Sequence, residues 1–259
     1  MTMGPTLLAA CRAGRQGGGH YPREGAATTG ARRTREDRIV AMNRAGIAAA
    51  VGLALLLPAC APAQSADPTA SATPNQGATC SYPLGGTPAR PVDPPSTTGV
   101  PTTGTASATL HFRSGDVTIT LDRAYAPCTV NSFLSLATQG FYTNTRCHRL
   151  VTSGIFILQC GDPTATGTGG PGYSFPDELS GHETYGAGTV AMANRGPDTN
   201  GSQFFLVFAD SPLPPSYTVF GQMDKAGLDV VKGIAAKGVD PKDGSTPVAD
   251  ATISSVTLG

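Results

Sequence analysis

Apolar and polar residues alternate in a series of short segments that runs from residue 109 to the end of the chain. Two of them, 109–113 and 116–121, flank Ser114-Gly115 and predict a β-hairpin. Further strand-like runs follow at 147–151, 156–159, 189–193, 203–208, 217–222 and 252–258. Many short strands predict an antiparallel sheet that curls to hide its edges, so the pattern indicates a β-rich barrel or sandwich.

Two segments have the apolar spacing of helices instead. The first begins at Pro127-Cys-Thr129 and ends at Gly140, and its apolar stripe comprises Val130, Phe133, Leu134, Leu136 and Ala137. The second fits residues 226–236, where it would direct inward Leu228, Val231 and Ile234. The pattern is therefore mainly β with two helices.

Composition divides the chain near residue 105. Residues 1–105 are rich in Gly, Pro, Ala, Ser, Thr and Arg, whereas residues 106–259 carry most aromatic and β-branched side chains and form the expected domain. About 150 residues are enough for one domain with a hydrophobic core. Residues 1–44 contain eight Arg and three acidic residues, which leaves 10 basic and 15 acidic residues elsewhere. A mildly acidic domain argues against nucleic-acid binding, which needs a basic face.

An apolar block, 45–57, follows Asn43-Arg44 and precedes Pro58-Ala59-Cys60. A short basic region, an apolar stretch and a small residue before a cysteine resemble a bacterial lipoprotein signal peptide, with Cys60 lipidated after cleavage. The block is shorter than the ~20 apolar residues of a membrane-spanning helix. We expect residues 42–60 to be this signal peptide and the protein to be an exported lipoprotein on the outer face of the cytoplasmic membrane. An uncleaved anchor and simple secretion are the alternatives.

The segments on either side of the signal peptide have low-complexity compositions. Residues 1–41 are rich in Arg and Gly without a hydrophobic period, which is typical of disorder. Because Met42-Asn-Arg would be a conventional start, we expect residues 1–41 to be disordered or an artefact of the start site. Residues 61–105 have the composition of a linker between a lipid and a domain, and within them 89–95 predict an extended polyproline segment.

Six cysteines are present, of which Cys11 precedes the expected mature chain and Cys60 would carry the lipid. The other four are even in number and lie in an exported chain, which favours two disulfides with three possible pairings. Because the strands at 147–151 and 156–159 should form a hairpin, we favour the pairs Cys147–Cys160 and Cys80–Cys128. A zinc site is the rival, but no C-x-x-C or H-x-x-x-H spacing exists, so we expect no metal.

Two stretches carry the most specific signal of the chain. The later one, Met192-Ala-Asn-Arg-Gly-Pro-Asp-Thr-Asn-Gly-Ser-Gln-Phe-Phe205, places the amide of Gln203 and the ring of Phe205 two residues apart, hence on one face of a strand. The earlier one contains Cys147-His-Arg-Leu150 and Phe156-Ile-Leu-Gln-Cys-Gly-Asp162. Together they resemble the cyclophilin family of peptidyl-prolyl cis-trans isomerases, in a bacterial, actinobacterial-like exported form, over residues 106–259.

The resemblance implies a closed eight-stranded antiparallel β-barrel capped by two α-helices, with the active site on the outer barrel face. It implies an enzyme that accelerates X-Pro isomerisation and the folding of exported proteins. No cofactor is implied, and the binding partners would be Pro-containing polypeptides. We expect a monomer that contacts the membrane only through its N-terminal lipid or anchor.

Isomerisation of an X-Pro bond requires no nucleophile. The barrier of ~18–20 kcal/mol comes from C–N double-bond character, so a catalyst must stabilise a twisted amide whose prolyl nitrogen has become basic. A fixed cationic donor does so, and the guanidinium of Arg never deprotonates. Arg149 follows His148 as the essential Arg of the family follows its His, so Arg149 is the catalytic candidate. The plain alternative is an exposed strand Arg in a surface ion pair.

The resemblance also assigns substrate-binding residues by position. In the two stretches they are Phe156, Ile157, Gln159, Ala193, Asn194, Arg195, Gln203 and Phe205. Two further pocket positions are matched by Leu213 and Tyr217, and a groove beside the site by Gly167 and Thr168. Gln203 would bond the substrate backbone, and Phe205 would form the floor of the proline pocket. For each residue the alternative is an ordinary strand or core position.

The chain departs from the family pattern in several places. Arg149 and Gln159 are ten residues apart, two more than usual, which predicts a longer turn at 151–154. Arg195 stands where a small residue is common, Tyr217 where a His is common, and Cys160 replaces a glycine. The chain contains no Trp. Because the family's Trp chiefly contacts the inhibitor cyclosporin, we predict weak inhibition with catalysis retained.

Other functions find less support. Residues 167–172 formally match the G-x-G-x-x-G of dinucleotide sites, but no helix is predicted after them, so nucleotide binding is not expected. Hydrolase and kinase motifs are absent from the sequence. The remaining alternatives are a Pro-peptide-binding module without turnover and a chaperone of the cell envelope. Isomerisation should be lost on mutation of Arg149, whereas chaperone activity should survive it.

Overall fold

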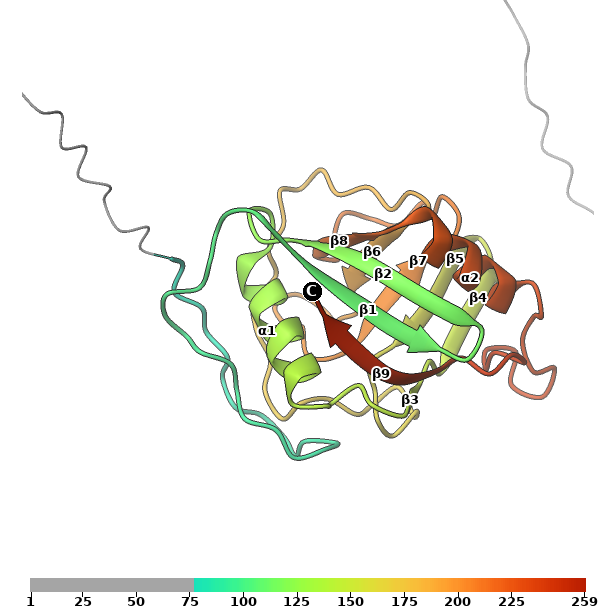
Figure 1. Cartoon of the computed structure of the whole chain (residues 1–259), viewed down its shortest axis with the longest axis horizontal. Coiled ribbons are helices and arrows are strands. Elements are labelled where there is room, and N and C mark those ends of the chain that lie inside the picture. The colour runs from blue at the N-terminus through green and yellow to red at the C-terminus, as the bar shows by residue number, and fades with distance from the viewer. Residues whose placement is uncertain (1–76) are drawn as a thin grey trace, which may run out of the picture. The chain divides into compact units, whose positions relative to one another are not determined.

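The structure is a computed structural model that describes residues 77–259. One curled β-sheet has a helix at either end (Figure 1). The elements in chain order are β1 (Thr105–Phe112), β2 (Gly115–Asp122), α1 (Pro127–Thr138), β3 (Thr145–Arg146), β4 (Arg149–Ser153), β5 (Ile155–Cys160), β6 (Thr189–Met192), β7 (Phe204–Val207), β8 (Val219–Met223), α2 (Lys225–Ala235) and β9 (Thr252–Leu258). The predictions for residues 1–41, the start at Met42 and the signal peptide with Cys60 lie outside the described residues.

The nine strands form a single antiparallel sheet in the order β3-β9-β1-β2-β8-β6-β7-β5-β4. Its two edge strands, β3 and β4, are separated in the chain only by Cys147 and His148, so the sheet curls until its edges meet. The N–H of Cys147 donates to the carbonyl of Ala251 at 2.9 Å, and the N–H of His148 donates to that of Gln159 at 3.0 Å. Counting β3 and β4 as one interrupted strand gives the expected eight, and the mainly-β fold with two helices is confirmed.

The hairpin predicted around Ser114-Gly115 is present, and β1 pairs with β2 along its whole length. Every second residue of these strands points to the inner face of the curled sheet, so the core contains Leu110, Val117, Ile119 and Leu121. Burial of each such side chain contributes about 1.5–3 kcal/mol. This alternation sets the register, because a slip by one residue would turn all of these side chains toward the solvent.

Charged side chains from other segments cap both ends of α1. The Glu178 carboxylate accepts hydrogen bonds from the backbone N–H groups of Cys128 and Thr129 at 2.9 and 2.8 Å. At the other end, Nη1 of Arg90 donates to the carbonyl of Gly140 at 2.8 Å. Each charge has the sign that the helix dipole favours at its end, so residues far away in the sequence stabilise α1.

The helix α2 begins at a side-chain cap. Asp224 accepts a hydrogen bond from the N–H of Gly227 at 2.6 Å. Val231 and Ile234 are buried as predicted, whereas Leu228 is half-buried. Within residues 77–259, neither helix is long and apolar enough to cross a membrane.

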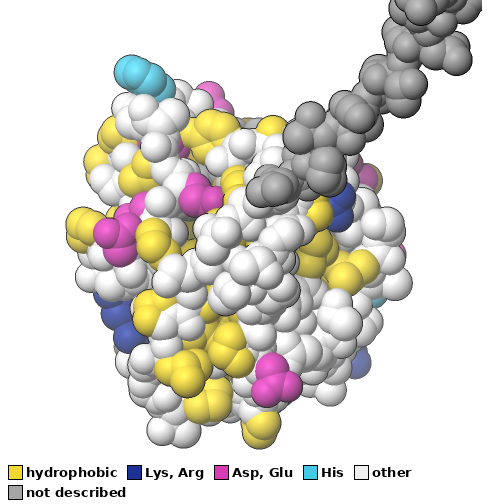
Figure 2. Space-filling model, turned by 90° about the vertical axis from the view of Figure 1, so that its left-hand side faces the viewer, with side chains coloured by type: hydrophobic (Ala, Val, Ile, Leu, Met, Phe, Trp, Pro, Cys, Tyr) yellow, Lys and Arg dark blue, Asp and Glu magenta, His cyan; other side chains and the backbone are white. Residues whose placement is uncertain are grey.

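Residues 77–104, here called the strap, have no regular element but lie fixed along the domain. A disulfide joins Cys80 to Cys128 of α1, and the side chains of Tyr82 and Val100 are buried. The part of the predicted 61–105 linker that forms the strap therefore packs on the domain, and its Pro-rich composition does not show the buried anchors that hold it. Figure 2 shows the face that carries α1 and the strap, where charged side chains are sparse.

The second disulfide joins Cys147, where the two sheet edges meet, to Cys160 at the end of β5. Both disulfides have the pairing favoured by the hairpin argument. The Cys147–Cys160 disulfide lies two residues from Arg149 and directly beside Gln159 in the sequence. It therefore links the residues just before β4 to the end of β5, within the first family stretch.

Candidate active site

One face of the sheet carries a row of side chains from four neighbouring strands. Arg149 in β4 is paired with Gln159 in β5, Gln159 with Phe205 in β7, and Phe205 with Ala191 in β6. Directly opposed residues of antiparallel strands point to the same face, so all four lie on the face opposite the main core. The sheet thus brings together Arg149, Gln159 and Phe205, as the resemblance implied.

Arg149, Gln159 and Gln203, here called the site network, form a hydrogen-bonded series. Nη1 of Arg149 donates to Oε1 of Gln159 at 3.2 Å, and Nε2 of Gln159 donates to Oε1 of Gln203 at 2.8 Å. Nε2 of Gln203 donates to the carbonyls of Gly167 and Gly169 at 3.0 and 2.8 Å. Both amide hydrogens of Gln203 are therefore used within the protein. Gln203 holds the 162–169 loop and does not present a free donor to a substrate.

That loop is wrapped around the buried carboxylate of Asp162. The carboxylate accepts hydrogen bonds from the N–H groups of Thr164, Gly167 and Gly169 at 2.8, 2.8 and 3.0 Å. A Cβ at residue 169 would overlap the carboxylate, which explains the glycine there. Burial raises the pKa of Asp162, but these hydrogen bonds and that of the Thr164 hydroxyl outweigh it and hold the pKa below its ordinary value. Asp162 ends the first family stretch, but neither its residue type nor its position predicted this role.

A second apolar cluster, here called the aromatic cluster, lies beside the site network and is separate from the main core. It contains Ile157, Tyr185 and Phe205, against which Leu213 and Tyr217 pack. The Tyr217 ring lies edge-on to Phe205, with centroids 5.6 Å apart. The Tyr185 hydroxyl donates to the carbonyl of Tyr217 at 2.9 Å and accepts from its N–H at 3.0 Å. Ile157, Phe205, Leu213 and Tyr217 are thus together, and Tyr185 is an additional member that no periodicity in the sequence marks.

Phe156 is the pocket candidate that the structure places elsewhere. Side chains alternate along β5, so Ile157 and Gln159 share the site face while Phe156 and Leu158 point to the opposite one. The Phe156 ring packs against Phe208, with centroids 5.9 Å apart, beside the main core. The structure therefore assigns Phe156 to packing and not to the aromatic cluster.

A groove of about 470 Å³ opens beside the site network. Its walls come from residues 167–174, from the turn 193–195 and from Gly85-Gly86-Thr87 of the strap, with Gln159 and Gln203 also lining it. The groove accounts for five residues assigned by the resemblance, Gly167, Thr168, Ala193, Asn194 and Arg195. The strap wall could not be predicted from the sequence, because the composition of residues 85–87 is that of a linker.

The turn that follows β6 connects the groove with the aromatic cluster. Nδ2 of Asn194 donates to the carbonyl of Ser216 at 2.9 Å, next to Tyr217. Nη2 of Arg195 donates to the carbonyl of Gly167 at 3.1 Å, across to the opposite wall of the groove. The Asn194 and Arg195 side chains therefore position segments of the site in addition to lining it.

His148, beside Arg149, is a packed residue. Within the described residues, neither of its buried ring nitrogens has a hydrogen-bond partner. Burial lowers the pKa of His148, with Asp162 acting against this effect and Arg149 adding to it. A neutral imidazole leaves Arg149 as the cation of the site network. In residues 77–259 no three His, Cys, Asp or Glu side chains are grouped as a metal site requires.

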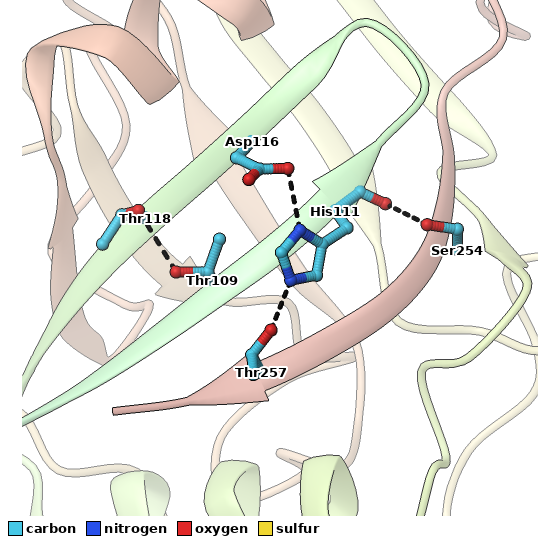
Figure 3. A network of polar contacts seen from close by, with 6 residues as sticks. All are labelled: Thr109, His111, Asp116, Thr118, Ser254 and Thr257. Carbon is cyan, nitrogen blue, oxygen red and sulfur yellow. Dashed lines mark hydrogen bonds and ion pairs between the residues drawn. The ribbon is translucent and has the colours of Figure 1, made fainter.

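A different set of three side chains, here called the outer network, lies on β1, β2 and β9 (Figure 3). Nδ1 of His111 bonds Oδ1 of Asp116 at 2.8 Å, and Nε2 of His111 bonds the Thr257 hydroxyl. Carboxylate, imidazole and hydroxyl in this order are the parts of a hydrolytic triad. Yet in the described part of the chain, neither the groove above nor a second one of about 390 Å³ beside β2 and β8 borders them. The outer network therefore lies apart from both of these grooves, whose concave shape is what a small-molecule site usually requires.

A family model described as "Cyclophilin type peptidyl-prolyl cis-trans isomerase/CLD" matches residues 107–258. This range is more than half of the chain and includes the site network and the aromatic cluster. The chain belongs to the cyclophilin family. This cyclophilin is accordingly a peptidyl-prolyl cis-trans isomerase.

Similar proteins are found in mycobacteria. "Probable peptidyl-prolyl cis-trans isomerase B" of Mycobacterium leprae (strain TN) is 47% identical over 200 residues, covering 71% of this cyclophilin and 68% of the relative. The protein of the same name from Mycobacterium tuberculosis (strain CDC 1551 / Oshkosh) is 46% identical over 201 residues, covering 71% and 65%. This cyclophilin thus spans about two thirds of the length of these relatives.

Solved structures support the fold. The crystal structure of a cyclophilin-type isomerase from Cryptosporidium parvum has a TM-score of 0.54 and 30% identity, covering 60% of this cyclophilin and 98% of that chain. A structure of the same Cryptosporidium protein in the presence of the dipeptide Ala-Pro has a TM-score of 0.53, with coverages of 59% and 98%. That dipeptide is an X-Pro unit, the kind of unit that peptidyl-prolyl isomerases act on.

Proposed function

We propose that this cyclophilin isomerises X-Pro bonds in segments of exported proteins, with Arg149 as the electrostatic catalyst. The observation that carries the proposal is the Arg149 guanidinium, bonded to Gln159 and in one row with Phe205. A twisted X-Pro amide has a basic prolyl nitrogen, because rotation removes its conjugation with the carbonyl. A permanent cation with N–H donors beside that nitrogen lowers the energy of the twisted state.

Arg149 has donors to spare for this task. Its side chain is exposed, and one bond to Gln159 leaves most guanidinium N–H groups for a bound peptide. Gln159 is in turn held by Gln203, and Gln203 by the loop carbonyls. The catalytic charge is therefore oriented before the substrate arrives, so it needs little reorganisation during the reaction.

The aromatic cluster would hold the proline ring. Phe205 is only 3% exposed, and the half-buried Tyr217 lies edge-on against it. We propose that the proline ring reaches Phe205 by displacing the Tyr217 side chain, with Ile157 and Leu213 as the remaining walls. The Ala-Pro dipeptide used with the Cryptosporidium relative supports this class of ligand.

Exchange NMR of an X-Pro peptide with the purified full chain tests the proposal. We expect Arg149→Ala to lower kcat/KM by about 10²–10³, the usual loss when a transition-state donor is removed. Arg149→Lys keeps the charge but not the planar fork of donors, so its kcat/KM should lie between those of the wild type and Arg149→Ala. Peptide affinity is measured in parallel. A full chain that binds the peptide without accelerating exchange would make the domain a binding module, and an active Arg149→Ala would exclude Arg149 as catalyst.

We also propose that the protein is an exported lipoprotein that acts as a monomer. The signal pattern ending at Cys60 supports export, as does the pairing of all four cysteines of residues 77–259 in disulfides, which persist in oxidising compartments. Labelling of cells with a radioactive fatty acid should mark the wild type and not Cys60→Ser. An unlabelled wild type that stays in the membrane would indicate an uncleaved anchor instead. Sedimentation of the purified protein checks the monomer.

A further inference from the structure

The groove beside the site network has a wall that lies outside the family match. Gly85, Gly86 and Thr87 line it from the strap, whereas the family model begins at residue 107. The opposite side comes from the turn that carries Arg195. The shape of this groove is therefore a property of this chain and does not follow from the family domain alone.

Backbone hydrogen bonds hold the strap wall in place. The N–H of Gly85 donates to the carbonyl of Gly172 at 2.9 Å, and the N–H of Ala89 donates to that of Gly170 at 2.8 Å. Between them, Pro88 packs so closely on residue 172 that a Cβ there would lie 3.0 Å from the proline ring. With the Cys80–Cys128 disulfide nearby in the sequence, the wall is built into the fold.

The side chains that line the groove carry positive charge and no negative charge. Its lining is otherwise glycine, hydroxyl, amide and other uncharged groups, and Arg195 is its one charged side chain. Within residues 77–259, Arg195 takes part in no ion pair; Nη2 donates only to the carbonyl of Gly167. The remaining guanidinium donors are free to bind a carboxylate, for which the planar fork of Arg is suited.

We infer that this groove is a subsite for an acidic side chain near the X-Pro bond, with Arg195 as the specificity-determining residue and Thr87 on the facing wall. This inference rests on the proposed function, because it concerns the polypeptide that the site isomerises. The groove borders the site network through Gln159 and Gln203, so the flanking residues of a peptide bound at Arg149 are within reach of it.

The test uses the full chain and a series of X-Pro peptides with Glu, Gln or Lys at each position flanking the proline. At one position we expect kcat/KM for Glu to exceed that for Gln by roughly threefold, the scale of an exposed ion pair. The preference should shrink in high salt, which screens the attraction. In Arg195→Gln the Glu-to-Gln ratio should approach one, and in Arg195→Lys it should persist. Thr87→Lys adds a second cation on the strap wall and should increase the ratio.

Arg123→Gln is the matched control, because Arg123 is a partly exposed Arg with a single carbonyl partner, Thr105, and does not line the groove. It removes the same charge and should leave the ratio unchanged. Equal rates for Glu and Gln at every position of the wild type would overturn the inference, as would an undiminished ratio in Arg195→Gln. A wild type that accelerates none of the peptides would overturn the proposed function itself, and the inference with it.

Discussion

The site network and the outer network are each a series of three polar side chains across strands of the same sheet. Arg149, Gln159 and Gln203 end on the carbonyls of a loop that lines a groove. In the outer network, the side chains of Asp116, His111 and Thr257 form their hydrogen bonds with one another on an exposed sheet surface, and the Ser254 hydroxyl donates to the carbonyl of His111 (Figure 3). The outer network has the residue types of a hydrolytic triad, whereas the site network has a single cation and two amides.

The difference shows that surroundings, more than residue types, make a site. The site network places a cation with spare donors beside the apolar cluster of Phe205 and holds it through the buried amide of Gln203, which is 8% exposed. The side chains of His111 and Asp116 are 32% and 60% exposed, so water competes for their hydrogen bonds. Interactions in the site network should therefore be worth more to both stability and rate.

The largest effect should come from the two disulfides. Cys80–Cys128 closes a separation of 48 residues and Cys147–Cys160 one of 13. Replacement of each pair by Ala should therefore lower the free energy of unfolding by about 4 and about 3 kcal/mol, because the unfolded chain gains loop entropy. The losses of activity should have the reverse order, because only Cys147–Cys160 joins the residues just before Arg149 to the residue just after Gln159. We expect its loss to lower kcat/KM about tenfold more. Urea unfolding measures the loss of stability in each variant, and exchange NMR measures the loss of activity. Equal activity losses in the two variants would contradict a positioning role for Cys147–Cys160.

The next largest effect should come from removal of the Gln203 amide. Gln203→Leu leaves the carbonyls of Gly167 and Gly169 without their donor, at a cost of about 2–4 kcal/mol in unfolding free energy, and frees the loop. Activity should fall with it, since Gln159 loses its partner. Thr257→Val makes the equivalent cut in the outer network, where we expect about 0.5 kcal/mol or less. Similar losses in the two variants would erase the distinction between the networks.

Acid should weaken the loop around Asp162. The pKa of Asp162 is held below its ordinary value of 3.8, so its stabilisation is complete above that pH and is lost as pH falls through the lower, folded-state pKa. Asp162→Asn should therefore be less stable than wild type at pH 7, and the gap should narrow in more acidic solution. The urea midpoints of the wild type and Asp162→Asn, measured at pH 7 and in the more acidic solution, test this. A gap that is independent of pH would mean that the charge of Asp162 is not what holds the loop.

The smallest effect should come from His111→Ala. Its imidazole bonds Asp116 and Thr257 on an exposed surface, so we expect a stability loss within about 1 kcal/mol and unchanged isomerisation. Hydrolysis of an activated ester by the wild type, lost in His111→Ala, would show that the outer network is a catalytic triad after all.

Much of the fold followed from local patterns. The alternation in β1 and β2 predicted their hairpin, and the two apolar stripes predicted α1 and α2 within two residues of their observed ends. Family motifs brought forward Arg149, Gln159 and Phe205, which the sheet does place in one row. These features depend on neighbours in the sequence or on short motifs, so they are visible without a structure.

Other features depended on partners far away in the chain. The face taken by Phe156 followed from how β5 meets the core, and the strap looked like a linker because Cys128 and Gly140, its anchors, lie beyond it. The tasks of Gln203 and Asp162 depended on which carbonyls and N–H groups the folded loop brings to them.

The sequence by itself therefore determined the elements, the family and the residue types of the site, since periodicity and motifs are local properties of the chain. Only the tertiary structure decided which side chains share a face, which polar groups remain free for a substrate, and that the strap walls the groove beside Arg195. Those outcomes arise from contacts between residues distant in sequence, which only the folded backbone brings together.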